Sequence, residues 1–245
     1  MRKSLVIAHR GASGYAPENT IAAINKALDM KADGIEIDVH LSKDGHLVVC
    51  HDEKLGRTSN GSGYVKDYTL EELKKLDFGS WYSSDYANER IPTLEEVLCL
   101  LRDKNVLLNI EVKNNVIIYE EIEKALVNLV RKYEMVEKVI ISSFNHYCVK
   151  EIKSLAPELK IGLLYSERLY KPGDYAKIVG AEAIHPYYIT INSDSINNCK
   201  KNGILINAWT INNPEHIKEA VALGIDGVIT NYPDIAKDIV SNMQT

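Results

Sequence analysis

Carboxylate side chains occur in a pattern that could hold a metal ion. Glu36 and Asp38 stand two positions apart in an apolar run, and Glu111 lies in a later apolar run. Residues two apart on a strand share a face, and buried carboxylates without a cation are costly or remain protonated. Carboxylate oxygens suit Mg²⁺ or Ca²⁺ and do not suit zinc or copper. We therefore expect Glu36, Asp38 and Glu111 to hold one divalent cation, although an isolated pair of this kind more often forms structural salt bridges.

Two cationic residues accompany these acids and indicate an anionic substrate. Arg10 follows the first apolar run, and Lys113 shares the expected strand face of Glu111. With three carboxylates and one divalent cation, these residues leave one net positive charge. A phosphodiester monoanion would neutralise that charge, so a substrate of this kind suits the predicted site.

Two histidines could transfer the protons that phosphodiester hydrolysis requires. An unperturbed imidazole titrates near neutral pH, so one ring can remove a proton while another supplies one. His9 ends the first run, and the turn at Asp44-Gly45 predicts a hairpin whose register brings His51 within a residue of Asp38. We therefore predict that His9 and His51 are the catalytic acid and base.

Other residues at expected strand ends are candidates for weaker roles. His185 and Trp209 end two of these strands, and we predict that both contact the substrate, Trp209 by stacking on its carbon chain. A core position is the alternative for each of them. His40 is expected on the same strand face as Asp38, as a metal ligand would be, but it stands near the end of its strand. Glu18 and Asn19 precede an apolar helical stripe, and we interpret them as capping residues, with Asn19 as the candidate N-cap.

Strand-like and helix-like segments alternate along most of the chain, which predicts a (β/α)8 TIM barrel. Eight apolar runs each precede an amphipathic stretch, a pattern that indicates a parallel sheet, and about 250 residues is a common length for such a barrel. The active site would then lie at the carboxyl ends of the strands. The expected strands are 5–8, 34–41, 106–112, 138–142, 161–164, 183–185, 205–208 and 227–229. The expected helices begin at 19 or 20 and then cover 93–102, 119–133, 146–155, 173–179, 193–201, 214–223 and 233–240.

A polar, aromatic-rich stretch at about 53–90 interrupts this alternation. It is too poor in apolar residues to fold as a separate domain, so we expect one domain over residues 1–245 with a small insertion after strand 2. Only 69–76 has a helical pattern, with Thr69 as N-cap and Glu72 three residues later. The aromatic residues of the insertion form either a small core of their own or part of a substrate pocket.

Composition and charge limit the other classes of function. The chain has 245 residues, is 45% hydrophobic and carries a net charge of −5, which does not favour a nucleic-acid partner. The four cysteines form no C-x-x-C pair, so we expect reduced thiols and no zinc site. We find no pattern of a signal peptide, and no apolar run approaches the roughly 18 residues of a membrane span. We expect a cytoplasmic protein without a stable membrane anchor.

Taken together and in order, these motifs resemble the glycerophosphodiester phosphodiesterase family over nearly the whole chain. The matching segments are His9-Arg10-Gly11 through Pro17-Glu18-Asn19-Thr20, Glu36-Ile37-Asp38-Val39, Lys43-Asp44-Gly45, His51-Asp52, Ile91-Pro92-Thr93-Leu94-Glu95-Glu96, Asn109-Ile110-Glu111-Val112-Lys113, Ser143-Phe144, Trp209-Thr210 and Gly224-Ile225-Asp226-Gly227. At Asn231 the family commonly has an aspartate.

The resemblance implies a (β/α)8 barrel that hydrolyses glycerophosphodiesters to glycerol 3-phosphate and an alcohol, in lipid and glycerol metabolism. It implies that Glu36, Asp38 and Glu111 bind a divalent metal, and that His9 and His51 are the acid and base. It also implies phosphate contacts for Arg10 and Lys113. A lysophospholipase D, a cyclising phosphodiesterase and a non-catalytic phosphate-binding barrel remain as alternatives. The head group, the native metal and the oligomeric state stay open.

Overall fold

Eight parallel strands form a closed barrel in the computed structural model, which describes residues 3–243. Strand β1 pairs with both β9 and β2, and these pairings close the sheet. The barrel strands are β1 (Leu5–His9), β2 (Gly34–Leu41), β4 (Leu107–Val112), β5 (Val139–Ser143), β6 (Lys160–Tyr165), β7 (Ala183–Pro186), β8 (Leu205–Ala208) and β9 (Gly227–Thr230). The predicted (β/α)8 fold is therefore confirmed.

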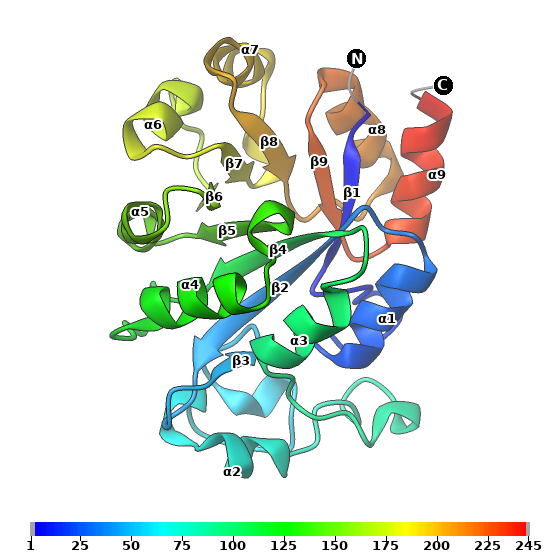
Figure 1. Ribbon diagram of the computed structural model, residues 1–245. Coiled ribbons are helices and arrows are strands. Elements are labelled where there is room, and N and C mark those ends of the chain that lie inside the picture. The colour runs from blue at the N-terminus through cyan, green and yellow to red at the C-terminus, as the bar shows by residue number, and fades with distance from the viewer. Residues whose placement is uncertain (1–2, 244–245) are drawn as a thin grey trace.

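Helices surround the barrel (Figure 1). Each presents a buried apolar stripe to the strands. In α1, for example, Ala23, Ile24 and Ala27 are buried, at the spacing of one helical face. The outer helices are α1 (Ile21–Asp29), α3 (Leu94–Leu101), α4 (Ile122–Lys132), α5 (His146–Leu155), α6 (Pro172–Val179), α7 (Ser193–Asn202), α8 (Pro214–Leu223) and α9 (Pro233–Met243).

Helices α1 and α4 begin later than the sequence predicts, and each difference has a local cause. The N-cap of α1 is Thr20, whose hydroxyl accepts the Ala23 N–H, so the prediction that Asn19 is the cap was wrong. Helix α4 begins at Ile122 instead of at Tyr119. The Tyr119 N–H is bound by the side chain of Asn114, and Glu121 has a φ of 68°, which interrupts the helix.

An antiparallel strand, β3 (Leu47–Val49), returns along β2 as the Asp44-Gly45 turn predicts. Val39 pairs with Val49, and the Cys50 N–H donates to the Asp38 carbonyl at 3.1 Å. The expected register is thus confirmed. It brings Cys50, and His51 after it, back along β2 to Asp38.

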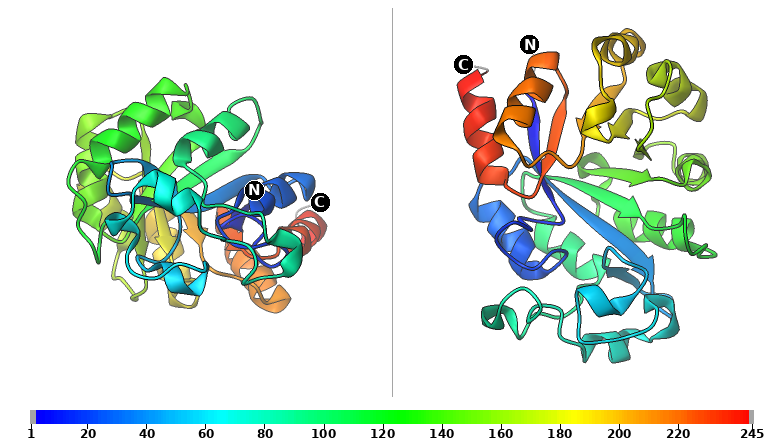
Figure 2. Two further views of the ribbon diagram at one scale, coloured as in Figure 1. Left: turned by 90° about the horizontal axis from the view of Figure 1, so that it is seen from below. Right: turned by 180° about the vertical axis from the view of Figure 1, so that it is seen from behind.

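The insertion at about 53–90 follows β3 and lies at the bottom of the view in Figure 1, below the β2–β3 hairpin; Figure 2 shows it from two other sides. It contains the short helix α2 (Leu70–Lys74), in which Thr69 and Glu72 form the expected capping box. A small separate core fills its interior, made of Val48, Cys50, Leu55, Val65, Leu73, Phe78 and Ile91. The hydroxyls of Tyr82 and Tyr86 donate to the backbone of Gly14 and Tyr15, so this segment is tied to the loop after β1.

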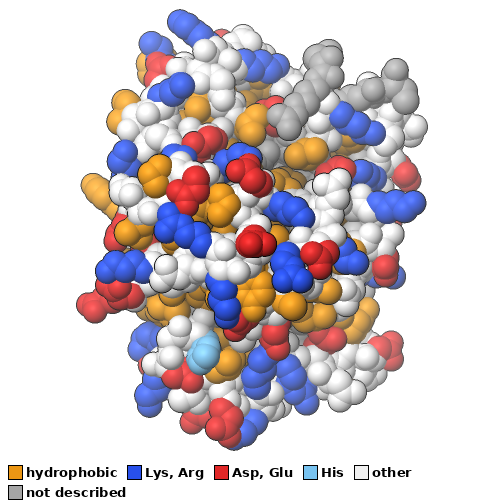
Figure 3. All heavy atoms as spheres, in the orientation of Figure 1, with side chains coloured by type: hydrophobic (Ala, Val, Ile, Leu, Met, Phe, Trp, Pro, Cys, Tyr) orange, Lys and Arg blue, Asp and Glu red, His pale blue; other side chains and the backbone are white. Residues whose placement is uncertain are grey.

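No helix within residues 3–243 combines the length and the apolar character needed to cross a bilayer. On the face shown in Figure 3, acidic and basic side chains are interspersed.

Candidate active site

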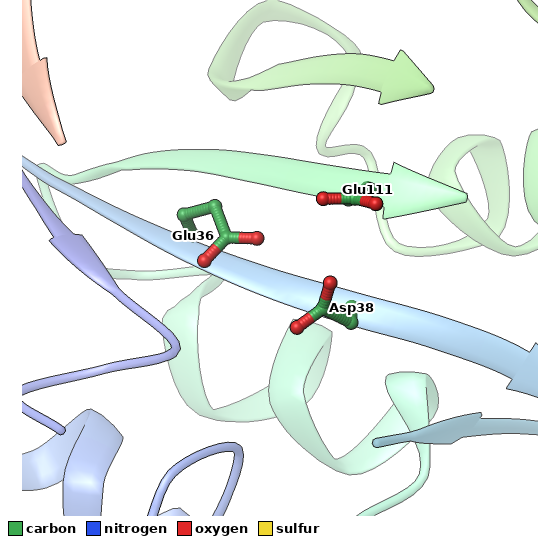
Figure 4. A group of neighbouring side chains, drawn as sticks. All are labelled: Glu36, Asp38 and Glu111. Carbon is green, nitrogen blue, oxygen red and sulfur yellow. The ribbon is translucent and has the colours of Figure 1, made fainter. Parts of the chain in front are cut away.

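Three carboxylates meet at the carboxyl end of the barrel, two from β2 and one from β4 (Figure 4). Glu36, Asp38 and Glu111 are all buried, and each offers an oxygen within 4.8 Å of the others. Parallel pairing aligns Asp38 with Glu111 directly, which is why residues distant in sequence come together. The Oδ1 atom of Asp38 is buried without a hydrogen-bond partner. A hard divalent cation fits this all-oxygen donor set and would satisfy that atom.

Two cations lie against this cluster and determine how its charge is distributed. Lys113 Nζ lies 2.8 Å from Glu111 Oε1 and 3.6 Å from Asp38 Oδ1. Arg10 Nε lies 3.4 Å from Asp38 Oδ2, and the backbone N–H of Arg10 donates to Glu36 Oε2 at 2.8 Å. The predicted cations therefore adjoin the carboxylates, and both are largely buried.

Burial and charge separate the pKa values of the three acids. Burial, followed by the charges of Asp38 and Glu111, raises the pKa of Glu36 well above its ordinary range. Burial raises the pKa of Glu111 to about 7, although Lys113 opposes the shift. Burial acts in the same direction on Asp38, but Lys113 and Arg10 outweigh it and hold the Asp38 pKa well below its ordinary value. Without a cation, protons therefore compensate for part of the negative charge.

His9 lies at the end of β1, where its ring is oriented by the end of the last strand. Its Nδ1 atom lies 2.7 Å from Asn231 Oδ1. With the amide oxygen at this position, Nδ1 carries the proton and Nε2 remains as an acceptor. Burial, and then the charge of Arg10, lowers the pKa of His9 to about 4. A neutral ring with a free lone pair is the form that accepts a proton.

His51 is oriented in a different way, by a carboxylate. Its Nδ1 atom lies 2.6 Å from Asp52 Oδ1, and because a carboxylate can only accept, the ring donates. Burial lowers the pKa of His51, while the charge of Asp38 and the bond to Asp52 oppose this shift. The two histidines therefore have unequal partners, a neutral amide for His9 and a carboxylate for His51.

A network of ion pairs that the sequence did not predict joins the two sides of this site. Arg57, from the segment after β3, binds Asp52 at 2.6 Å and Glu18 at 2.7 Å. Glu18 in turn binds Arg10 at 2.7 Å. Asp52, Glu18 and Arg57 thus connect His51 with Arg10. The interpretation of Glu18 as a helix cap was wrong, since its carboxylate is engaged with two arginines.

Asn19 also belongs to the site rather than to the helix. Its Nδ2 donates to Asp38 Oδ2 at 2.9 Å, and its Oδ1 accepts the Asp38 N–H at 3.3 Å. The residue is buried and has a φ of 58°. Asparagine tolerates this left-handed conformation better than most residues. The positive φ directs the side chain back to β2, a geometry that no local sequence signal indicated.

A cavity of about 190 Å³ opens beside these groups. Its charged and polar lining residues are His9, Arg10, Glu36, His51, Asn109, Glu111 and Thr210. Its apolar lining residues are Phe144, Leu164, Trp209 and Ile229. Trp209 packs edge-on against Phe144 at a centroid distance of 5.5 Å, so it is a wall residue, as its position in the sequence suggested. No aromatic residue of 53–90 lines this cavity.

His185 does not line this cavity. Its side chain is fully buried inside the barrel, where Nε2 accepts a hydrogen bond from Asn207 at 3.1 Å. The prediction that its side chain contacts the substrate is therefore not supported. The backbone carbonyl of His185 accepts the Trp209 Nε1–H at 2.7 Å, so this residue orients the wall of the cavity.

A larger hollow of about 900 Å³ lies at the opposite, amino-terminal end of the strands. Leu5, Asp33 and Leu107 are among its lining residues, and none of the predicted site residues reaches it. The smaller cavity is therefore the candidate active site, because most of the predicted site residues line it and none of them lines the larger hollow.

Comparisons with known proteins give one consistent result. Residues 9–235 match the glycerophosphoryl diester phosphodiesterase family. The chain is 49% identical over 238 residues to a glycerophosphodiester phosphodiesterase of Caldanaerobacter subterraneus, covering 97% of this chain and 98% of that protein. Its fold is similar to that of an Oleispira antarctica phosphodiesterase in complex with the product sn-glycerol-3-phosphate, with a TM-score of 0.88, 31% identity and coverage of 98% and 97%. A Silicibacter pomeroyi structure shares the fold at a TM-score of 0.91 and 24% identity, over 99% and 94% of the two chains.

Proposed function

The chain belongs to the glycerophosphoryl diester phosphodiesterase family and is a phosphodiesterase, and from this premise we propose how it acts. The reaction is metal-dependent hydrolysis of a glycerophosphodiester to glycerol 3-phosphate and an alcohol. His9 and His51 transfer the protons. The observation that carries this proposal is the cavity in which both histidines, Arg10 and two of the three clustered carboxylates meet.

The cation would be held by Glu36, Asp38 and Glu111. These are oxygen ligands only, so Mg²⁺ or Ca²⁺ fits them. When bound, a divalent cation supplies positive charge that polarises a phosphoryl oxygen. Only Asp38 is prepared for this role before an ion arrives, because Lys113 and Arg10 hold its pKa well below the ordinary value. The pKa values of Glu36 and Glu111 are raised, so these two ligands would release protons when the cation binds.

His9 is suited to accept a proton and His51 to donate one. Asn231 fixes the proton of His9 on Nδ1 and leaves Nε2 free for the hydroxyl of the nucleophile. Asp52 stabilises the protonated ring of His51, which can then protonate the departing alkoxide. The nucleophile is either water or the glycerol 2-hydroxyl, and detection of a cyclic phosphate would identify the second route.

Arg10 and Lys113 would stabilise the negative charge that develops on the phosphoryl oxygens. Each is now bound to carboxylates, Arg10 to Glu18 and Lys113 to Glu111. These contacts fix their positions before the substrate binds, and preorganised charge of this kind favours the transition state.

The size of the cavity favours a small, deacylated substrate. A volume of about 190 Å³ accommodates a glycerophosphate group but not a long acyl chain. Trp209 and Phe144 offer an apolar wall for the glycerol carbons. The lysophospholipase D alternative requires additional space, so a substrate panel of deacylated and monoacyl diesters discriminates between the two.

The direct test combines chelation with two substitutions. Glycerol 3-phosphate release should stop with a chelator and return with Mg²⁺ or Ca²⁺. His9→Ala and His51→Ala should each lower kcat at least about a hundredfold while circular dichroism shows an intact fold. Activity that survives chelation would remove the metal from the proposal, and a near-normal rate in either variant would remove that histidine.

A further inference from the structure

A fully buried histidine, His40, lies next to the candidate active site without belonging to the carboxylate group. It is on β2, at the next position of the same parity as Glu36 and Asp38, and it pairs with Val48 of β3. Its side chain is 0% exposed and does not line the active-site cavity. The nitrogens of a buried imidazole need hydrogen-bond partners, and both ring nitrogens of His40 have one.

The two partners of His40 fix its tautomer. Nε2 lies 3.1 Å from the backbone carbonyl of His51, and Nδ1 lies 3.0 Å from the Tyr119 hydroxyl. A carbonyl can only accept, so Nε2 carries the proton. Nδ1 of the neutral ring then accepts the Tyr119 O–H. The rings of His40 and Tyr119 also pack edge-on, with centroids 5.8 Å apart.

The hydrogen bond from His40 Nε2 to the carbonyl of His51 lies where the backbone pairing of β2 with β3 ends. The backbone ladder between β2 and β3 extends to Cys50, whose N–H donates to the Asp38 carbonyl. Strand β3 ends at Val49, so the ladder cannot hold the backbone of His51. The His40 side chain provides the next hydrogen bond in its place.

Tyr119 is itself held in place, so the contact is anchored at both ends. The Tyr119 N–H donates to Asn114 Oδ1 at 2.7 Å, and Asn114 Nδ2 donates to Glu123 at 2.8 Å. All three residues are buried. The loop that follows β4 is therefore connected to the backbone of His51 through Tyr119 and His40.

We propose that His40 is a positioning residue for His51, and that Tyr119 supports this role by fixing the tautomer of His40. The inference rests on the proposed function, in which His51 transfers a proton. Asp52 orients the ring of His51, and His40 holds its backbone. Together they keep the ring directed at the cavity.

Three substitutions test this role. His40→Phe keeps a planar ring but removes both hydrogen bonds, and it should lower kcat at least about tenfold with a smaller change in KM. His40→Gln should recover most of the loss, because an amide can donate to the carbonyl and accept from Tyr119. Tyr119→Phe should lower kcat less than His40→Phe, and it should have no further effect when His40 is already Phe.

A matched control and a second readout separate positioning from general destabilisation. Tyr133→Phe also removes a tyrosine hydroxyl bond, the 2.7 Å contact with Glu95, but has no connection to His51. It should leave kcat unchanged. In protein with labelled histidine, the His51 ring resonance, assigned by its loss in His51→Ala, should shift or broaden in His40→Phe and stay in place in Tyr133→Phe.

The outcomes are distinct. If His40→Phe is folded and retains both kcat and the His51 resonance of the wild type, the proposal is overturned. If His40→Phe does not fold, Tyr119→Phe is the deciding variant, because it leaves the imidazole of His40 in place. A wild-type kcat and a wild-type His51 resonance in Tyr119→Phe would overturn the role of Tyr119, and with it the proposed positioning of His51 through His40 and Tyr119. If the wild-type protein hydrolyses no glycerophosphodiester, the proposed function fails, while the resonance still decides whether His40 positions His51.

Discussion

Replacement of Asn19 by alanine tests whether this residue supports the carboxylate cluster or merely begins a helix. Asn19 makes two hydrogen bonds to Asp38, one to the side chain at 2.9 Å and one to the backbone at 3.3 Å. It does so from a left-handed backbone conformation, with a φ of 58°. The substitution therefore removes a partner of a buried carboxylate and also introduces backbone strain.

The expected magnitude follows from these two terms. Loss of a hydrogen bond to a charged group costs about 1.5–3 kcal/mol, and a left-handed backbone costs an ordinary L-residue about 1–2 kcal/mol. Asn19→Ala should therefore lower the free energy of unfolding by about 2.5–5 kcal/mol. Asn19→Gly avoids the strain and should lose only the first term. Cation affinity should fall about 10–100-fold in both variants, as for other residues that orient metal ligands.

Urea unfolding in the presence of chelator measures the stability term, and calorimetric titration with Mg²⁺ or Ca²⁺ measures the affinity. Thr20→Ala is the matched control, because Thr20 is the N-cap of α1. It should cost about 1 kcal/mol without changing cation affinity. If Asn19→Ala binds the cation as tightly as the wild type and loses no more stability than Thr20→Ala, the structural assignment of Asn19 is refuted.

Three further predictions concern proton transfer, pH and the cavity wall. Asp52→Asn should lower the pKa of His51, because the carboxylate stabilises the protonated ring, and an NMR titration should show the shift together with a lower kcat; an unchanged titration would contradict it. Burial raises the pKa of Glu111 to about 7, so cation binding below that pH must release a proton, and affinity should weaken as pH falls. Calorimetry in two buffers of different ionisation enthalpy should detect the released proton, and equal heats would argue against it. Trp209→Ala should raise KM about tenfold or more with a smaller effect on kcat. Trp209→Phe keeps an aromatic ring but loses the bond to His185 and part of the indole surface, so it should change KM less.

Local periodicity in the sequence was enough to assign part of the site. Side chains alternate along a strand, so the sequence alone assigns Glu36 and Asp38 to one strand face, and Glu111 and Lys113 to one face of another strand. The Asp44-Gly45 turn determined the hairpin register, and the register returned His51 to Asp38. These inferences needed no knowledge of how distant segments pack, because each rests on backbone geometry over a few residues.

The partners of these residues depend on the tertiary fold and could not be assigned from the sequence. Asn231 reaches His9 because β9 closes the barrel against β1, and Arg57 reaches Glu18 because a long segment folds back over the loop after β1. His185 was assigned to the substrate because it ends a strand, but the ring lies inside the barrel over Gly162, where a side chain would have no room. Contacts of this kind depend on closure of the barrel and on side-chain volume in its interior. Neither leaves a periodic signal in the chain. The sequence was therefore enough to predict the candidate catalytic and metal-binding residues, whereas the residues that orient them could be assigned only from the tertiary structure.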